Sequence, residues 1–532
     1  MGERFIDPAD NLTKLYFSLK DYEYFKGKTV FIDSFKGFTG QQFKIIDRIL
    51  SQAENVYLSV TYNPENNKEY GIFSNIRKSC KDIEKIALKN SVFVNEPIFL
   101  NKSYYNEDFD LLEKLMAGED VSVIENIQNI NIIEASNSFA EAQFAARIIR
   151  NLVRTKGYRY RDFVIISRDA GAYKQAVLSS CKENGVSLFY DEKIPLSAFP
   201  FSVAVEKIIS ALNMSTENIL QFHKTGLGTL SFEEISTLEN YTYLWNVTGD
   251  LWLKDWDMDP RGFTNEPDTA EMLKDLEYIN ALRKRAVEPI VNFKNSLTDY
   301  ADGIVTAIMK LFDDCDVSSK LFDISNKLSA DNDGYEFDLL SSAYEEFIKI
   351  LDSIIICFEN KRISISQFEE IFALSVSLCE IGVIPQLLDQ VTFGSADRIR
   401  TSRPKVAIIL GANQGVFPKT INNSGIFNVG ERKKLIDNGL IISDNSLFSS
   451  IDEEYLVYSN LCCASDMLFV CYSNQTFTGE LTEPSYFVKK IKDKLCVETQ
   501  RFNGCGILPE TEQSAFSEYC KSRFNDKDYS AS

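Results

Sequence analysis

Short β-branched runs alternate with amphipathic helical segments along most of this chain, and this alternation restricts the possible folds more than any other feature. Strands separated by helices pair in parallel and are covered by helices. The clearest helix spans residues 138–155, where apolar side chains recur at helical spacing and Gly157 follows the last turn. The pattern therefore predicts an α/β protein with parallel sheets. The expected strands are residues 30–32, 56–60, 130–134, 163–167, 187–190, 406–410 and 468–472.

A long block in the middle of the chain has a different pattern. Between about residues 213 and 385, Glu and Lys alternate with Leu, Ile and Phe in long helical segments. Strand-like sequence returns at Gln390, so one α/β domain is interrupted by an all-helical insertion. The predicted boundaries are 1–130 for a first α/β domain, 131–212 and 386–495 for the two parts of a second, 213–385 for the insertion and 496–532 for a poorly packed tail.

The strand at residues 30–32 ends at Asp33, and a loop of Gly, Thr and Phe then leads into an amphipathic helix at about residues 41–52. In open α/β sheets, ligands bind outside the carboxyl ends of the strands, so Asp33 is placed to hold a metal ion on a nucleotide phosphate. The alternative is that Asp33 caps the following turn. Ser34 stands where a second carboxylate would orient an attacking water, and no GxxxxGK[ST] loop occurs. A nucleotide-hydrolysing site on this strand would therefore be incomplete.

Composition excludes several classes of function. The formal net charge of −20 argues against a free-standing nucleic-acid-binding protein, because phosphate contacts depend on clustered Lys and Arg. With His223 as the single histidine, Ser/His/Asp triads, HExxH zinc sites and HD pairs are excluded. The 11 cysteines form no CxxC pair, which favours reduced core thiols over a metal cluster. Without a secretory signal or a long apolar span, a cytoplasmic protein is expected.

A small basic island stands out in this acidic chain. It consists of Arg398, Arg400, Arg403 and Lys405, with the hydroxyl residues Thr392 and Ser395 nearby. Such a group near a strand end suits contact with the phosphates of a single nucleic-acid strand. The alternative is a solvated loop that happens to be basic. We favour the phosphate contact because the surrounding charge is of the opposite sign.

Four segments at residues 29–42, 134–190, 382–400 and 452–464 carry a resemblance to a known family. The first segment has the form FIDxFxGFTxQQ, and the second contains Phe163-Val164-Ile165-Ile166-Ser167-Arg168. The third segment is followed by GANQGVFP, and the fourth has the sequence DEEYLVYSNLCCA. In this order they resemble four parts of superfamily 1 helicases: motif II, the start of the second motor domain, motif V and motif VI. In the second of these parts, Arg168 stands at the motif IV arginine. Within that superfamily, the chain is similar to AddB, one of the two subunits of the bacterial AddAB (RexAB) helicase-nuclease.

The resemblance implies two RecA-like parallel-sheet domains, with the all-helical insertion in the second. It implies a subunit that binds and scans a DNA single strand during double-strand break repair and recombination, in a heterodimer with an AddA-like helicase-nuclease subunit. The chain would be a middle fragment of the parent, without the Walker A segment and the C-terminal nuclease domain. For the full-length parent the resemblance also implies ATP with Mg²⁺ and an iron–sulfur cluster; none of these cofactors is expected in the fragment.

Departures from the family pattern suggest that this segment does not hydrolyse ATP. Motif VI of active motors supplies an arginine to the γ-phosphate, and the resemblance places Cys463 in that position. Asp33 and Arg168 would then be vestigial nucleotide and magnesium contacts, and Arg168 could equally be a surface arginine after a strand. No catalytic or metal-binding residue is assigned. Two alternatives stay open, namely an active ATP-dependent helicase motor and a structural scaffold without DNA contact.

Overall fold

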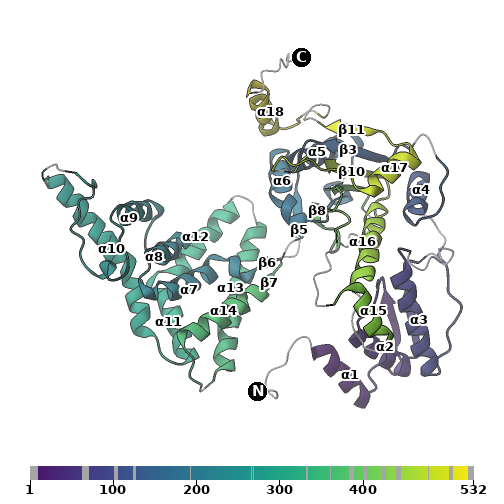
Figure 1. Ribbon diagram of the computed structural model, residues 1–532, viewed down its shortest axis with the longest axis horizontal. Helices are drawn as coiled ribbons and strands as arrows, with labels where there is room; N and C mark the ends of the chain where they lie inside the picture. Colours follow the sequence, from purple (N-terminus) through teal and green to yellow (C-terminus); the bar gives the residue numbers. More distant parts are fainter. Residues whose placement is uncertain are drawn as a thin grey trace. The chain divides into compact units, whose positions relative to one another are not determined.

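The computed structural model divides into two compact units, Met1–Tyr190 with Leu388–Ser532, and Asp191–Leu387 (Figure 1). The first unit is an α/β unit made from two separate stretches of chain, and the second is helical. The structure describes residues 10–62, 71–100, 106–123, 127–191, 193–264, 267, 269–330, 334–359, 361–382, 389–399, 404–420, 427–438, 445–476, 478–502, 507 and 509–524.

A two-stranded parallel sheet forms the first part of the α/β unit. Strands β1 (Thr29–Asp33) and β2 (Asn55–Ser59) pair over their whole length, with Asp33 opposite Ser59. Alternate side chains of both strands pack against α2 (Gly40–Gln52) and α3 (Ser74–Lys89), and α1 (Asn11–Asp21) packs on α2. A capping box between Thr39 and Gln42 fixes the start of α2. The predicted strand, loop and helix around Asp33 are thus confirmed.

A seven-stranded sheet forms the rest of the α/β unit, in the order β11-β3-β10-β9-β4-β8-β5. Every pairing in this sheet whose register is described is parallel, as the strand and helix alternation predicted. The strands are β3 (Ile130–Ala135), β4 (Phe163–Ser167), β5 (Leu188–Asp191), β8 (Val391–Ser395), β9 (Val406–Leu410), β10 (Met467–Ser473) and β11 (Thr499–Phe502). The α/β fold class with a large parallel sheet is therefore confirmed.

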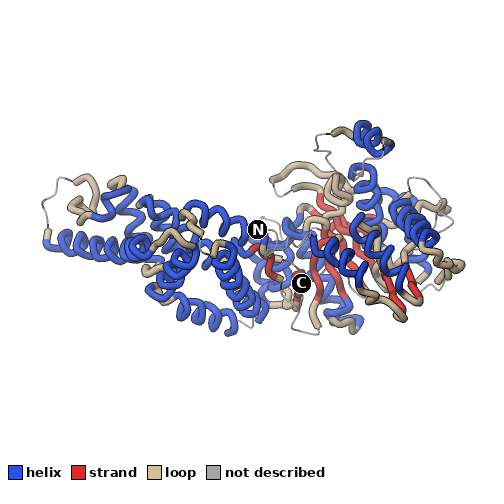
Figure 2. Tube along the Cα trace, turned by 90° about the horizontal axis from the view of Figure 1, so that it is seen from below, coloured by secondary structure: helices blue, strands red, loops and turns tan. Residues whose placement is uncertain are grey.

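Helices cover both faces of this sheet, as Figure 2 shows for the red strands between blue helices. Val164 and Ile166 of β4 point to one face, with α4 (Glu107–Met116), α16 (Asn445–Leu461) and α17 (Tyr486–Leu495). Phe163 and Ile165 point to the other face, with α5 (Ser138–Lys156) and α6 (Ala170–Glu183). Because successive strand residues face opposite sides, a strand buried on both sides is apolar throughout, which explains why β4 and β9 were easy to predict. The helices α15 (Val429–Asp437) and α18 (Glu512–Phe524) complete the unit.

The second unit is a helical bundle around one large apolar core. Its helices are α7 (Pro200–Ser210), α8 (Thr216–Phe222), α9 (Phe232–Leu244), α10 (Ala270–Ser296), α11 (Ala301–Asp314), α12 (Val317–Ala330), α13 (Gly334–Cys357) and α14 (Ile365–Leu378). A short antiparallel pair, β6 (Ile194–Pro195) with β7 (Glu380–Ile381), joins the two ends of the unit. The single histidine, His223, is buried here and contacts the carbonyl oxygen of Ala286 through Nε2 at 3.0 Å. Within the described part of the chain, no helix has the length and apolarity needed to cross a membrane.

Two boundaries differ from those that the sequence suggested. The helical unit begins at Asp191 rather than near residue 213, because α7 buries Phe201, Val205 and Ile208 in the helical core. Part of the supposed tail is also ordered: β11 pairs in parallel with β3 and places Phe502 in the core. Beyond it, α18 is tied to the buried Arg147, which donates a hydrogen bond to Glu518 over 2.8 Å.

Candidate functional site

The carboxyl ends of β4 and β9 define the best place for a ligand on the seven-stranded sheet. These two strands are neighbours, but α6, which follows β4, lies on one face of the sheet and α16, which follows β9, lies on the other. In open α/β sheets, ligands bind at such a point, where the connections diverge. Arg168 follows the last residue of β4 directly, so the predicted arginine does lie at this position.

Arg168 is held by a carboxylate of the same unit. Its Nε atom lies 3.1 and 3.0 Å from the two carboxylate oxygens of Glu453, and its Nη2 donates to Oε1 over 2.7 Å. Glu453 lies on α16 and also accepts the backbone N–H of Lys419 at 3.0 Å, so it links β4 to the turn after β9. Hydrogen bonding to Glu453 raises the pKa of Arg168 above its ordinary value. The guanidinium is therefore already paired with an internal anion.

A second acid lies on the other side of Arg168. The carboxylate of Asp397 is 3.7 Å from the guanidinium of Arg168. The same carboxylate accepts a hydrogen bond from the hydroxyl of Ser395. Burial raises the pKa of Asp397, but other effects outweigh it. Hydrogen bonds from the Ser395 hydroxyl and the Asp397 amide, together with the charges of Arg168 and Arg398, bring the pKa of Asp397 below its ordinary value. With Glu453 and Asp397 both beside its guanidinium, Arg168 itself is not free to receive a nucleotide phosphate.

The predicted basic island is divided between opposite ends of the sheet. Ser395 is the last residue of β8, and Arg398 follows it within one turn at the carboxyl end. Lys405 precedes the first residue of β9 at the amino end, where its ammonium lies 3.3 Å from Asp162. Thr392 lies within β8 opposite Val164. Arg400 and Arg403 lie outside the described residues. Of the four predicted DNA contacts that belong to the described residues, the structure thus brings together Ser395 and Arg398.

Asp33 lies at the carboxyl end of the smaller sheet, and its carboxylate accepts a hydrogen bond from the hydroxyl of Ser59 on the paired strand. The next residue, Ser34, has a positive φ of 59° and donates its backbone N–H to the carbonyl of Ser59. Asp33 and Arg168 therefore belong to different sheets and share no partner among the described hydrogen bonds.

A buried carboxyl group that sequence reasoning did not select as a site residue lies beside the carboxyl end of β9. Glu141, in the first turn of α5, is fully buried and accepts hydrogen bonds from the Gly411 N–H at 2.7 Å and the Tyr173 hydroxyl at 2.9 Å. Burial raises the pKa of Glu141 to about 7, and the hydrogen bonds from Gly411, Tyr173 and Ser473 act against that rise. The signal was a glutamate on the apolar side of a helix, beside Ala142.

The resemblance implied Mg²⁺-ATP and an iron–sulfur cluster for the parent and none of them for this fragment. In the part of the chain that the structure describes, no three His, Cys, Asp or Glu side chains come together in a way that could hold a metal ion. Burial raises the pKa of Cys181 and Cys463 to about 12, which disfavours the thiolates that bind iron. We therefore derive no step through Mg²⁺-ATP or an iron–sulfur cluster for these residues.

Comparison with known proteins bears on the resemblance. Residues 1–115 match a family model described as "ADDB, N-terminal". The chain is also 27% identical over 506 residues to the B subunit of the ATP-dependent helicase/deoxyribonuclease of Clostridium novyi (strain NT), and the match covers 92% of this chain and 43% of that protein. The predicted AddB/RexB resemblance is confirmed.

Other relatives with the same name match the chain with similar identity and over a similar length. The corresponding B subunits from Acetivibrio thermocellus and Caldanaerobacter subterraneus subsp. tengcongensis are 27% and 29% identical to this chain, which they cover over 96% and 92% of its length. The matched parts are 45% and 44% of those proteins. The chain thus spans less than half of the length of these curated relatives, and it is similar to them almost from end to end.

Proposed function

We propose that this chain is the helicase-like, single-strand-binding part of an AddB-type subunit, within an ATP-dependent helicase/deoxyribonuclease that acts in DNA double-strand break repair and recombination. The names of the relatives and their similarity over at least 92% of the chain support this proposal. Its partner is an AddA-like helicase-nuclease subunit in the cytoplasm, which supplies translocation. The role of the present chain is then to hold and scan the strand.

One observation supports a scanning role over a motor role, namely the engagement of Arg168 by Glu453. An arginine that stabilises a γ-phosphate must have donors directed at the developing charge. Here those donors are directed at an internal carboxylate, and Asp397 adds a second negative charge. A nucleotide would have to displace Glu453 before Arg168 could take part in hydrolysis.

The absence of hydrolysis is tested by measuring phosphate release from ATP by the 532-residue chain with saturating single-stranded DNA. We expect no release above the rate without enzyme. Turnover above that rate would refute the non-hydrolysing proposal and favour an active motor.

The DNA contact is tested by the change Arg398→Ala, with Lys405→Ala as the matched control. Both remove one positive charge, but Arg398 lies at the carboxyl end of the sheet and Lys405 at the amino end. Fluorescence anisotropy with labelled oligo-dT should show weaker binding for Arg398→Ala and a salt dependence reduced by about one unit of slope. Equal affinity of this variant and the unmodified chain would instead favour a scaffold without DNA contact.

A further inference from the structure

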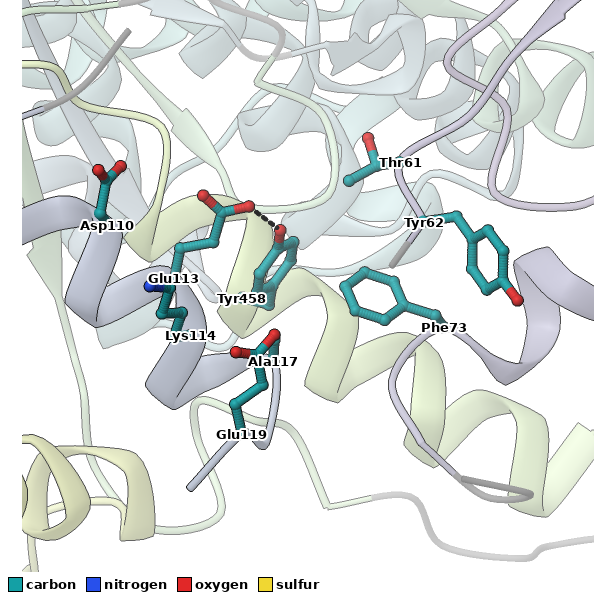
Figure 3. A pocket seen from close by; sticks show the side chains of 9 residues that line it. All are labelled: Thr61, Tyr62, Phe73, Asp110, Glu113, Lys114, Ala117, Glu119 and Tyr458. Atoms are coloured by element: carbon teal, nitrogen blue, oxygen red, sulfur yellow. Dashed lines mark hydrogen bonds between the residues drawn. The ribbon is translucent and has the colours of Figure 1, made fainter. Parts of the chain in front are cut away.

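A pocket of about 340 Å³ lies between the segment that follows β2 and the helices α4 and α16, within the α/β unit. Figure 3 shows its two sides. Thr61, Tyr62 and Phe73 line one side, and residues of α4 and its following turn line the other, with Tyr458 of α16 between them. The other lining residues are Asp110, Glu113, Lys114, Ala117 and Glu119. The volume is at the small end of the range for ligand pockets, which suits one large side chain or a small molecule.

The charges of the pocket favour a cation. Three of its lining residues carry a carboxylate, namely Asp110, Glu113 and Glu119, and only Lys114 carries a positive charge. The surrounding chain has a net charge of −20, so the wider field has the same sign as the pocket. A phosphate group would meet repulsion here, whereas an ammonium or guanidinium group would be attracted.

One carboxylate is fixed in position before any ligand arrives. The Tyr458 hydroxyl donates a hydrogen bond to Glu113 Oε1 over 2.9 Å, as the dashed line in Figure 3 marks. Burial raises the pKa of Tyr458, and the neighbouring Cys462 and Glu113 raise it further, so the phenol keeps the proton that it donates. A carboxylate held by one oxygen keeps a defined orientation for a second, charge-assisted hydrogen bond.

The aromatic residues distinguish between the two kinds of cation. Phe73 and Tyr458 are packed edge to face, with their ring centroids 5.3 Å apart, and both are buried, so the half-buried Tyr62 is the lining ring that a ligand can stack on. A planar guanidinium both stacks on aromatic rings and binds a carboxylate with two parallel N–H groups, which a lysine ammonium does not. We propose that this pocket receives the guanidinium of an arginine presented by a partner protein.

The proposal is tested by calorimetric titration of the 532-residue chain with Nα-acetyl-arginine methylamide, which reproduces an arginine inside a polypeptide. We expect a dissociation constant of about 1 mM and binding at least about tenfold weaker for the neutral citrulline counterpart. The phosphate compound AMP serves as the anionic control and should not bind. Equal binding of citrulline, or tighter binding of AMP, would overturn the proposal.

Two variants make the test independent of folding. Glu113→Gln removes a pocket charge and should weaken binding by about fivefold to tenfold, while Lys114→Ala removes the opposing charge and should strengthen it. Glu480→Gln makes the same charge change in an exposed turn outside the pocket and should leave binding as it was. Damage to the fold cannot produce opposite effects in the first two variants. If both weaken binding equally, the electrostatic argument fails.

Discussion

Removing Glu453 should destabilise the α/β unit by more than the loss of an ordinary surface ion pair. The side chains of Arg168 and Glu453 are only 19% and 10% exposed, and Glu453 also accepts the Lys419 N–H. Breaking a fully buried pair from one side costs about 3–5 kcal/mol, and an exposed pair contributes less than about 1 kcal/mol. For this partly buried pair we expect Glu453→Ala to lower the free energy of unfolding by about 3 kcal/mol, including about 1 kcal/mol for the unpaired Lys419 amide.

Arg168→Ala should cost less, because Glu453 keeps the Lys419 amide as a partner. We expect about 2 kcal/mol for this variant and about 3.5 kcal/mol for the double variant, since the two residues lose the same interaction. The coupling energy of the cycle is then about 1.5 kcal/mol. Lys85→Ala, which breaks the exposed pair with Asp82 in the same unit, is the matched control and should leave the transition almost unchanged.

The tryptophans allow the two units to be followed separately during urea unfolding. All three, Trp245, Trp252 and Trp256, belong to the helical unit, so tryptophan fluorescence reports that unit alone. Far-UV circular dichroism reports both. The variants should shift the part of the dichroism transition that belongs to the α/β unit and leave the fluorescence midpoint in place. A coupling energy near zero would show that Arg168 and Glu453 do not form the pair described here.

Three further outcomes are expected in the α/β unit. Because the pKa of Glu141 is raised in the folded state, its stabilising contribution is complete below about pH 4.5 and is lost as the pH rises through about 7. The free energy of unfolding should therefore fall by about 3 kcal/mol over this range. In Glu141→Gln this fall should be absent, as measured by urea titrations at several pH values. Gly411→Ala should lower the melting temperature, because Gly411 has a φ of 72° and a β-carbon there would approach the Tyr173 hydroxyl to 3.0 Å. Thr39→Ala should cost about 1 kcal/mol in urea unfolding, because it removes the capping box with Gln42, and a serine there should restore it.

Strands β4 and β9, which are buried on both faces, were predictable, whereas the edge strand β11 was not. Residues 163–167 and 406–410 are continuous apolar runs, and the structure has β4 and β9 with the same limits. Strand β11 reads Thr-Gln-Arg-Phe, and only its last residue is buried. A strand at the edge of a sheet has one neighbour and a polar surface, so hydrophobic patterning alone does not distinguish it from a loop.

The candidate site was predicted only in part, because its contacts are distant in sequence. Arg168 was selected because the resemblance places it at the motif IV arginine, but its partner Glu453 lies 285 residues away. Ser395 and Lys405 looked like neighbours because they lie within about ten positions of each other. Strands β8 and β9 both run parallel to β4, so the chain that leaves the carboxyl end of β8 must return to the amino end of β9. Proximity in the sequence therefore placed together side chains that the topology separates.

The position of Glu453 connects the architecture of this sheet with the proposed role. At the point where the connections of β4 and β9 diverge, an open α/β sheet normally leaves an electropositive space for an anionic ligand. In this chain, an internal carboxylate takes the donors of Arg168 and the amide of Lys419, so an anionic ligand at this point would have to displace Glu453. The proposed division between two subunits, in which a separate motor moves the DNA strand, requires no nucleotide at this position.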